Sequence, residues 1–424
     1  MKKVLILAYY WPPKGGVGVQ RWLKLTKYLC RHKYQPIVYT QEGGVTPLQD
    51  YSLLNSIPKQ VEVIKNKIFE PSQLFSFFRK KKHTSDILMK TKFNFLDFIF
   101  IWLRTNFFIP DARSFLINPS ISFLNNYLKS NPVDVIVSSG PPHSMHMIAL
   151  SLKQQHNLKW IADFRDPWTD IEYFDKLPFL PFIKSKHKTM EKKVVSNADL
   201  VLSVSPYWAN QLQQLGAQRT CVLYNGFDGE DYRQSIQKTH SNRFKIGHFG
   251  VYNELRDHSF LWKVINQISY ENKDFFSHLQ LFFAGEVYDD FVVNMKSHNL
   301  DDKLTCEGFL NHNQSIQKMM DCDVLLVTQS MTQSVKGRLP AKFFEYLGAK
   351  RPILAIGKKK SDLEKIVKSI SYAWFVDFNN SKLLFDTILE IYELCKTHHY
   401  FSDDISKFSR ENQVKTLIQL IEDL

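Results

Sequence analysis

The sequence contains few cysteines, and they are widely scattered. None of the five in 424 residues stands at a spacing typical of a metal site or of a disulfide framework: Cys30, Cys221, Cys306, Cys322 and Cys395. The sequence therefore argues against a zinc protein and against a disulfide-stapled secreted domain. A protein of a reducing cytosol is the expectation.

Long apolar runs are also missing. The most apolar stretch, residues 93–110, is interrupted by Asp97 and Arg104, so it falls short of the roughly 18 clean residues that a membrane-spanning helix requires. Near its start the sequence has two lysines and then a strand-like run, Val4–Ala8, which leads into aromatic residues and prolines. That pattern is unlike a secretory signal, and we expect neither export nor a membrane span.

Positive charge is in clear excess. The formal net charge is +13 and the isoelectric point is near 9.2. This excess predicts an acidic partner, which could be a phosphate-bearing substrate, an anionic membrane or a nucleic acid. The basic residues do not fall into a recognised nucleic-acid-binding motif, so we do not expect nucleic acid as the partner.

The chain is long enough for two domains. Strand-like apolar runs alternate with helical periods along it, which is typical of parallel sheets in α/β proteins. The first series of strands is expected at Val4–Ala8, Pro36–Thr40, Val133–Ser138, Lys159–Asp163 and Leu200–Val204. The second series is expected at Phe244–Phe249, Leu279–Ala284, Leu304–Glu307, Val324–Thr328, Ile353–Ile356 and Tyr372–Val376.

Our interpretation is two successive Rossmann-like domains that face an interdomain cleft. We expect the first domain at residues 1–224 and a polar linker at 225–242. The second domain is expected at 243–403. A final helix at 404–424 has no strand of its own and could cross back onto the first domain.

The most informative segment runs from residue 337 to residue 356. Pro340 suits a first helical turn, and a helix-forming run follows it. Arg338 and Lys342 would then flank a helix N-terminus, where backbone N–H groups and the helix dipole favour an anion such as a diphosphate. Glu345, about one turn further on, could accept hydrogen bonds from ribose hydroxyls. The alternative is an ordinary amphipathic helix with solvated cations.

Two glycine-rich loops suit the same chemistry. One contains Gly16 and leads into a helix, and the other contains Gly250 and is followed by Arg256. A glycine near a strand end with a cation close by suits a bound phosphate. Prolines and aromatic residues separate the first strand from its glycines, so that loop is not the dinucleotide fingerprint and NAD is not expected. A structural turn and a surface salt bridge of Arg256 are the alternatives.

Polar residues also follow two strands of the first series. His143 and His146 follow one strand, and Asp163, Arg165 and Asp166 follow another. Ligands bind at the carboxyl ends of strands in α/β sheets, so the histidines could contact a donor sugar or an acceptor. An aspartate could bind sugar hydroxyls or act as a general base, and His146, His143 and Asp166 are the candidate catalytic residues. Packing histidines and an Arg165–carboxylate pair that holds the loop are the alternatives.

With these motifs placed, the chain resembles the retaining glycosyltransferases of family 4, which have the GT-B fold and include bacterial envelope and capsule sugar transferases. The resemblance runs almost from end to end. Its motifs are the Trp11-Pro-Pro-x-Gly-Gly-Val loop, Ser139-Gly-Pro-Pro-His-Ser, Asp163-Phe-Arg-Asp-Pro-Trp, Asn225-Gly-Phe-Asp, the Phe249-Gly turn with Arg256, Ala284-Gly-Glu, Glu307-Gly-Phe and Leu339-Pro-Ala-Lys-Phe-Phe-Glu-Tyr-Leu.

The resemblance implies that the C-terminal domain binds a nucleotide-sugar donor and the N-terminal domain an acceptor. Transfer would depend on stabilising the departing diphosphate and on positioning the acceptor hydroxyl. No metal or cofactor is expected, because cations would neutralise the phosphates and no Asp-x-Asp pair is placed to hold a metal. The residues implied at the donor are Arg256 and Lys342 at the diphosphate, Glu345 at the ribose, Gly16 near the phosphates and the acceptor, and His146 or His143 near the sugar.

Two positions depart from the family pattern. Gly337 stands where the family has a glutamate, eight positions before the ribose-binding one. Leu261 replaces a lysine that usually follows the phosphate-binding arginine by about five residues. We expect Arg338 to supply the missing charge.

Residues 74–109 combine many aromatic residues with a basic run at Arg79–His83. That combination suits a peripheral contact with anionic lipid, which would deliver a lipid-linked acceptor; an internal pair of packed helices is the alternative. We expect a cytoplasmic glycosyltransferase, with a contact at the inner face of the membrane as an option, acting on a surface, capsular or lipid-linked glycan. A sugar-nucleotide epimerase and a non-catalytic binding protein on the same scaffold are the competing functions.

Overall fold

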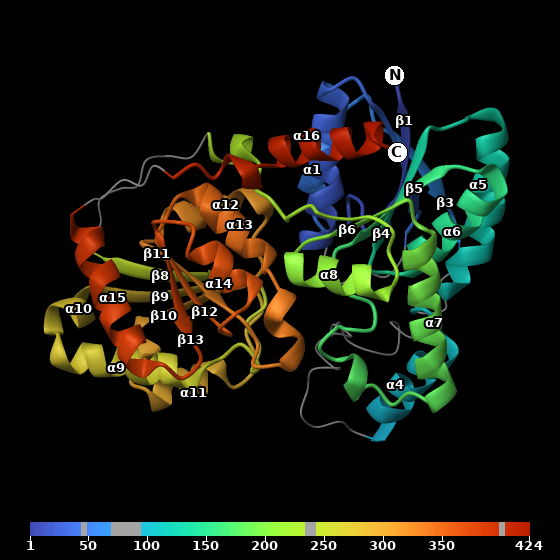
Figure 1. The fold of residues 1–424 in the computed structure, drawn as a ribbon. Coiled ribbons are helices and arrows are strands. Elements are labelled where there is room, and N and C mark those ends of the chain that lie inside the picture. The colour runs from blue at the N-terminus through green and yellow to red at the C-terminus, as the bar shows by residue number, and fades with distance from the viewer. Residues whose placement is uncertain (44–48, 69–94, 234–242, 398–402) are drawn as a thin grey trace. The chain divides into compact units, whose positions relative to one another are not determined.

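The computed structural model describes residues 1–43, 49–68, 95–233, 243–397 and 403–424. The chain forms two compact units: unit 1 is Met1–Tyr224 together with Glu411–Leu424, and unit 2 is Asn225–Arg410. Each unit has one parallel β-sheet with helices on both faces (Figure 1). The predicted fold class, two Rossmann-like α/β domains, is confirmed. The part of the predicted linker at 225–233 belongs to unit 2, and 234–242 lies outside the described residues.

Unit 1 has a seven-stranded sheet in the order β3-β2-β1-β4-β5-β6-β7. The strands are β1 (Lys3–Leu7), β2 (Gln35–Gln41), β3 (Glu62–Asn66), β4 (Val135–Gly140), β5 (Lys159–Phe164), β6 (Leu200–Ser203) and β7 (Thr220–Val222). The strand order reverses between β1 and β4. The segments that follow these two strands therefore flank the point at which such sheets bind ligands.

The helices of unit 1 bury both faces of this sheet. They are α1 (Val17–Arg31), α4 (Phe95–Phe107), α5 (Ile117–Ser130), α6 (Ser144–His156), α7 (Pro181–Asn197), α8 (Pro206–Leu215) and α16 (Arg410–Glu422). Side chains alternate along a strand, so Val4 and Ile6 of β1 pack into one core cluster with α1 and α16. Leu5 and Leu7 pack into the other cluster with α5 and α6.

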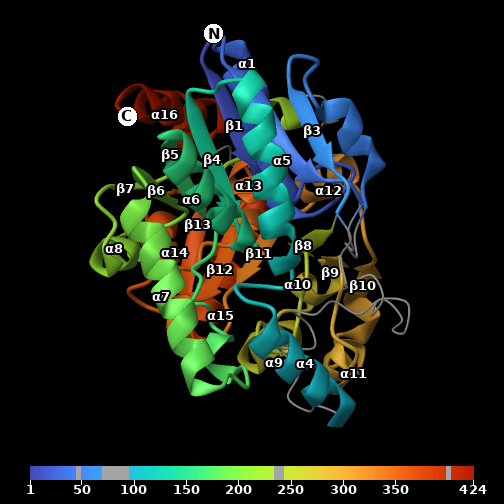
Figure 2. The ribbon, with the colours of Figure 1, turned by 90° about the vertical axis from the view of Figure 1, so that its right-hand side faces the viewer.

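The final helix, α16, belongs to unit 1 from Glu411 onward. Leu417 and Ile421 of α16 share a core cluster with Trp22 of α1, and both views show α16 beside α1 (Figures 1 and 2). The helix begins at Arg410, later than predicted, because the backbone before it is bonded to Phe227. The Phe227 N–H donates to the carbonyl of residue 408 at 3.1 Å, and the Arg410 N–H donates to the Phe227 carbonyl at 2.8 Å.

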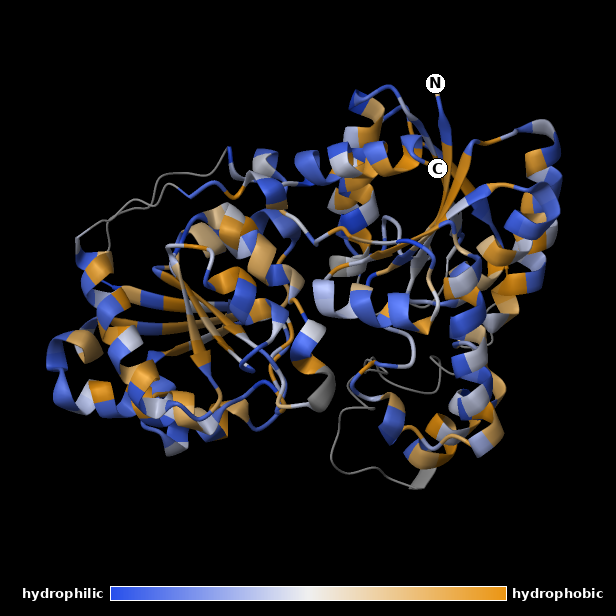
Figure 3. Ribbon diagram, viewed as in Figure 1, coloured by the Kyte–Doolittle hydropathy of each residue, from blue (hydrophilic) through white to orange (hydrophobic). Residues whose placement is uncertain are grey.

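Unit 2 has a six-stranded sheet in the order β10-β9-β8-β11-β12-β13. The strands are β8 (Phe244–Phe249), β9 (Leu279–Ala284), β10 (Leu304–Glu307), β11 (Val324–Thr328), β12 (Ile353–Gly357) and β13 (Ala373–Asp377). The order reverses between β8 and β11, so the loops after these two strands flank the expected ligand position of this unit. The strands are rich in hydrophobic residues (Figure 3).

The helices of unit 2 also cover both faces of its sheet (Figure 1). They are α9 (Ser259–Glu271), α10 (Lys273–His278), α11 (Phe291–Ser297), α12 (His312–Met320), α13 (Ala341–Ala349), α14 (Asp362–Val367) and α15 (Ser381–Lys396). Buried side chains of α9, α10, α11 and α15, among them Trp262, Phe275 and Phe291, form one core cluster with the sheet. Helix α13 leads away from the switch point and carries the segment that the sequence singled out.

Candidate functional site

Helix α13 begins one residue later than the sequence suggested. Pro340 was predicted inside the first turn, but it has φ −58° and ψ 128° and precedes the helix. Its carbonyl accepts the first helical hydrogen bond, from the Phe343 N–H at 3.0 Å. A residue whose carbonyl starts the helix while its own backbone is extended occupies the cap position.

The approach to α13 is fixed by Gln329, which follows β11 and is fully buried. Its side-chain amide donates to the Arg338 carbonyl at 2.7 Å and accepts from the Lys358 N–H at 3.1 Å. One side chain therefore ties together the ends of β11 and β12 and the residue before Leu339. The backbone of Arg338, a candidate donor-binding residue, is held in place by this contact.

The loop after β8 closes against the same region. Gly250 has φ 119°, a conformation that favours glycine, and its carbonyl would lie 2.5 Å from a Cβ on Gly285. The Tyr346 hydroxyl of α13 accepts from the Phe249 N–H at 2.9 Å. The loop after β8 and the helix after β11 are therefore linked directly across the switch point of the sheet.

Two of the predicted phosphate ligands approach one buried histidine. The Arg256 guanidinium donates to the Val251 carbonyl at 2.8 Å. The pKa of His248 is lowered to about 4, chiefly by burial and also by the positive charges of Arg256 and Lys342, while the hydrogen bond to the Leu326 carbonyl acts in the opposite direction. His248 donates from Nδ1 to the Leu326 carbonyl at 3.1 Å, so its neutral ring keeps Nε2 as an acceptor. Arg256 and Lys342 are thus both near enough to His248 for their charges to act on its ring.

Lys342 and Glu345 contact each other. The Lys342 ammonium lies 2.6 Å from a Glu345 carboxylate oxygen, and the Glu345 side chain is 12% exposed. The Tyr232 hydroxyl donates to the Glu345 backbone carbonyl at 2.7 Å. The sequence assigned these two side chains to different parts of a donor and did not predict their ion pair.

Sequence reasoning missed the residue that positions Arg256. The next residue, Asp257, accepts hydrogen bonds from Tyr252 at 3.1 Å and from Asn294 at 2.7 Å. Trp262 and Tyr288 also donate to this carboxylate. Four donors from three segments fix the turn from which Arg256 projects. An acidic neighbour of Arg256 was visible in the sequence, but its partners were not.

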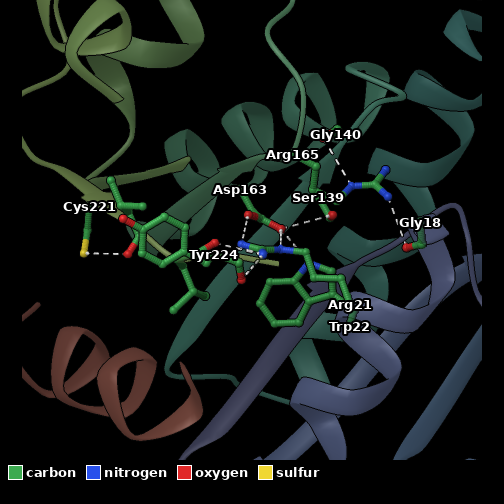
Figure 4. Close-up of polar contacts among 11 residues, drawn as sticks. Gly18, Arg21, Trp22, Ser139, Gly140, Asp163, Arg165, Cys221 and Tyr224 are labelled. Carbon is green, nitrogen blue, oxygen red and sulfur yellow. Dashed lines mark hydrogen bonds and ion pairs between the residues drawn. The ribbon is translucent and has the colours of Figure 1, made fainter. Parts of the chain in front are cut away.

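In unit 1 the end of β5 is tied to α1 by a buried ion pair (Figure 4). Arg21 donates to both oxygens of Asp163, at 3.0 and 2.8 Å, and the Trp22 indole donates to Asp163 at 2.8 Å. Burial raises the pKa of Asp163, but Arg21 outweighs burial and the net pKa is lowered. Both carboxylate oxygens of Asp163 are therefore bonded inside unit 1.

Arg165 has a different partner set from the one expected. It donates to the Gly18 carbonyl at 3.1 Å and to the Gly140 carbonyl at 3.3 Å (Figure 4), rather than to Asp163. It therefore holds the glycine loop to the end of β4. Gly16 caps α1 with φ 97° in this loop, and Asp166 is half-buried beside Arg165.

The two candidate histidines, His143 and His146, lie in unit 1 at the start of α6. Burial lowers the pKa of His146 to about 3 and holds the pKa of His143 well below its usual value, so both rings are neutral at neutral pH. The Ser138 hydroxyl lies 2.7 Å from His146 Nδ1 and accepts from the Trp160 indole at 2.8 Å. A hydroxyl has one O–H donor and two lone pairs, so it can donate to His146 Nδ1 while it accepts from the indole.

The second nitrogen of each ring is buried. His146 Nε2 and His143 Nδ1 have no hydrogen-bond partner among the described residues. His143 stacks on Trp168 with ring centroids 4.7 Å apart. Neutral rings of this kind can hydrogen-bond to a hydroxyl, but they cannot supply a positive charge near pH 7.

Comparison with known proteins decides the family. A family profile described as Glycosyltransferase Family 4 matches residues 15–231, more than half of the chain. The chain belongs to Glycosyltransferase Family 4. No curated protein matches this family 4 glycosyltransferase.

Several solved structures share the fold of this glycosyltransferase. Sucrose-phosphate synthase from Thermosynechococcus elongatus is 12% identical with a TM-score of 0.66, covering 100% of this chain and 99% of that one. TarM from S. aureus is 11% identical with a TM-score of 0.60, covering 99% and 100%. A putative UDP-N-acetylglucosamine 2-epimerase from Listeria monocytogenes is 10% identical with a TM-score of 0.56, covering 100% and 96%. At these identities the likeness shows the GT-B fold alone.

Proposed function

We propose that this protein transfers a hexose from a nucleoside-diphosphate sugar, bound by unit 2, to a surface, capsular or lipid-linked glycan, bound by unit 1. The observation that carries the donor assignment is the proximity of Arg256 and Lys342 to His248, beside the switch point of the unit 2 sheet. Two cations close to a ligand position of this kind suit a diphosphate.

The proposed chemistry is retaining transfer without an enzymatic nucleophile. As the bond to the sugar breaks, negative charge grows on the departing diphosphate, and the cations of Arg256 and Lys342 stabilise it. The acceptor hydroxyl attacks from the same face of the sugar, so positioning contributes much of the acceleration. His146 and His143 are the proposed contacts of the donor sugar. We expect no metal requirement, and an assay after chelation and dialysis tests that.

Gly337 and Leu261 stand where the family pattern has a glutamate and a lysine. We propose that Arg338 supplies the missing charge, because Gln329 fixes its backbone at the entry to α13. An Arg338→Ala variant is then expected to bind donor about tenfold more weakly, as loss of a charge-assisted hydrogen bond predicts. Unchanged donor affinity would remove Arg338 from the proposed site.

Thermal unfolding with UDP, GDP, ADP, CMP and NAD tests the donor site. A nucleotide at about 100 times its dissociation constant stabilises the folded protein by about 2.7 kcal/mol, which shifts the unfolding midpoint measurably. We expect one nucleoside diphosphate to stabilise the parent and to have little effect on Lys342→Ala. Lys382→Ala is the matched control, because Lys382 is exposed on α15.

Either of two results would count against the donor site. One is the absence of a shift with every nucleotide, which favours the non-catalytic binding protein. The other is an equal shift in the parent and in Lys342→Ala. A sugar-nucleotide epimerase is separated by its products, because it converts a sugar nucleotide without any acceptor, whereas a transferase releases nucleoside diphosphate in proportion to acceptor glycosylated.

We also propose that the protein is cytoplasmic and that α4 and its neighbours make a peripheral contact with the anionic inner face of the cytoplasmic membrane. Phe98, Leu103 and Phe107 of α4 are 48%, 41% and 68% exposed, and Phe115 is 51% exposed. Exposed aromatic residues of this density suit the membrane interface. The basic run Arg79–His83 lies outside the described residues. No helix in the described part of the chain is long and apolar enough to cross a bilayer. Flotation with anionic vesicles, for the parent and for Phe107→Ser, tests this contact.

A further inference from the structure

The His143 ring is held differently from the ring of His146. His146 Nδ1 lies 2.7 Å from the Ser138 hydroxyl. The His143 ring, by contrast, makes no hydrogen bond to any residue that the structure describes. The orientation of His143 therefore depends on the rings that pack against it.

One of these rings is stacked on His143 and almost parallel to it. The Trp168 ring, shortly after the end of β5, has its centroid 4.7 Å from that of His143, and the angle between the two planes is 4°. Phe164 and His146 are further away, at 5.9 and 5.7 Å, and are tilted by 33° and 34°. Trp168 is therefore the neighbour that determines the plane of the His143 ring.

Helix α7 holds the side chain of Trp168 through His187. The Trp168 indole N–H donates to His187 Nδ1 at 3.1 Å. An indole can only donate, so Nδ1 is the acceptor and His187 is neutral, with its proton on Nε2. The pKa of His187 is lowered to about 4, chiefly by burial, which agrees with a neutral ring at pH 7. Phe174 and Phe179 pack against His187 at centroid distances of 5.6 and 5.1 Å.

The same helix also holds the main chain at Trp168. Glu191 accepts from the Trp168 N–H at 3.3 Å and from the Thr169 N–H at 3.4 Å, and the Thr169 hydroxyl donates to it as well. Glu191 follows His187 by one helical turn, so the two side chains lie on one face of α7. Trp168, His187 and Glu191 are 3%, 4% and 3% exposed. Helix α7 thus fixes both the ring and the backbone of the residue that is stacked on His143.

We propose that His187 is a positioning residue, which through the Trp168 ring holds His143 in the orientation that contacts the sugar of the donor. The contact with the sugar rests on the proposed function, whereas the effect of His187 on His143 rests only on contacts within unit 1. His187 acts through Trp168 and is not assigned a contact with substrate.

NMR of the full chain with 13C at the histidine Cε1 atoms tests the effect on His143 without any activity. A proton stacked on an indole is shifted by the ring current, so the His143 Cε1–H resonance should lie upfield of a free neutral imidazole. Its absence from the spectrum of His143→Gln identifies it. We expect His187→Leu, which cannot accept from the indole, to move the resonance downfield. His187→Asn has an acceptor oxygen at the δ position and should keep most of the upfield shift.

Titration calorimetry tests the effect on the sugar. UDP-glucose, GDP-mannose and ADP-glucose are each compared with their nucleoside diphosphate, and the pair that the parent binds most tightly is used. We expect His187→Leu to weaken binding of the sugar nucleotide about tenfold, as loss of one hydrogen bond predicts, and to leave binding of the nucleoside diphosphate unchanged. His187→Asn should recover most of the affinity. His156→Leu is the matched control, because it removes a histidine bonded to Asn125 at the other end of α6.

Several outcomes overturn the positioning role of His187. One is a His143 resonance that is not upfield in the parent, or that stays in place in His187→Leu. Another is equal weakening of the sugar nucleotide and the nucleoside diphosphate by His187→Leu, or no weakening of the sugar nucleotide. A third is a His187→Asn variant as impaired as His187→Leu.

Failure of the proposed function gives a different result. If the parent binds none of the nucleotides, the donor site fails, while a resonance that moves in His187→Leu still supports the contact from His187 to His143. Variants are first checked for an unchanged unfolding midpoint. His187→Met, which has only a weak acceptor, replaces His187→Leu if that variant fails to fold.

Discussion

The Lys342 ammonium lies 2.6 Å from the Glu345 carboxylate, one turn apart on α13. The two groups proposed to bind the diphosphate and the ribose of a donor are therefore partners of each other. An ion pair that is partly open to water contributes only about 0.2 to 1 kcal/mol. A diphosphate can thus take Lys342 from Glu345 at small cost and leave the carboxylate to accept from ribose hydroxyls.

Replacement of Glu345 tests that exchange. We expect Glu345→Ala to weaken binding of the preferred nucleoside diphosphate about tenfold, since a hydrogen bond to a charged group contributes about 1.5 to 3 kcal/mol. The variant should also lose the parent's preference for the ribonucleotide over its 2′,3′-dideoxy analogue, measured by titration. Glu271→Ala, at an exposed site on α9, should keep it. A Glu345→Ala protein that still discriminates against the dideoxy nucleotide would place the ribose elsewhere.

The buried pair of Arg21 and Asp163 should be far more important for stability than a surface pair. The two side chains are 1% and 0% exposed, and Arg21→Met would leave an unpaired buried carboxylate, which costs about 3 to 5 kcal/mol. Lys2→Met removes the partner of Glu422, where both side chains are more than 40% exposed, and should cost less than about 1 kcal/mol. Urea unfolding measures both, and equal costs would contradict the assignment.

Protonation of Asp163 in acid should weaken the Arg21–Asp163 ion pair. The pKa of Asp163 is lowered in the folded protein, so its contribution to stability is present above the unfolded pKa of about 3.9. That contribution is lost as the pH falls through the folded pKa. Between pH 7 and pH 5 Asp163 should therefore add no pH dependence of its own.

Buried histidines should dominate the pH dependence in that range. The pKa of His146 is lowered to about 3, so the unfolded chain binds a proton below about pH 6.5 that the folded protein does not. Stability therefore falls as the pH drops, by about 2 kcal/mol between pH 7 and pH 5 for this one residue. His146→Gln should remove that share of the slope in urea unfolding. The exposed control His32→Gln should not, and an unchanged slope in His146→Gln would show that its ring is protonated when folded.

The effect of Gly348→Ala on stability should depend on the neighbouring side chain of Tyr232. A Cβ at this position would lie 2.6 Å from the Tyr232 ring, so Gly348→Ala must displace that ring and should destabilise unit 2 by about 1 to 3 kcal/mol. In a Tyr232→Ala background the obstacle is gone, and Gly348→Ala should instead stabilise by up to about 1 kcal/mol through helix propensity. Thermal unfolding of the four proteins measures the cycle. A destabilising effect in both backgrounds would exclude Tyr232 as the cause.

Much of the fold was predictable because short apolar runs in the sequence indicate the buried strands. The expected strands are all present, with ends shifted by no more than two residues. The strands that were missed are β3 and β7, which lie at the two edges of the unit 1 sheet. Side chains of an edge strand are less fully buried, as in β3 and β7, so their pattern carries less apolar signal.

The site was predictable where a local motif specifies it and unpredictable where distant segments meet. The Gly250 turn, Arg256, Lys342 and Glu345 could be named from their neighbours in sequence. Their roles in binding remain predictions. The partners of Asp163 and Asp257 could not be named, because Arg21 and Asn294 lie on other elements of the chain.

The position of α16 has a consequence for how the chain is made. The face of the unit 1 sheet formed by Val4 and Ile6 is completed by Leu417 and Ile421, which the ribosome adds only after all of unit 2. Since domains tend to fold as they emerge, a nascent unit 1 carries an uncovered apolar strip for as long as unit 2 is being synthesised. Chaperone binding to stalled nascent chains should therefore persist through translation of unit 2 and end when α16 leaves the exit tunnel.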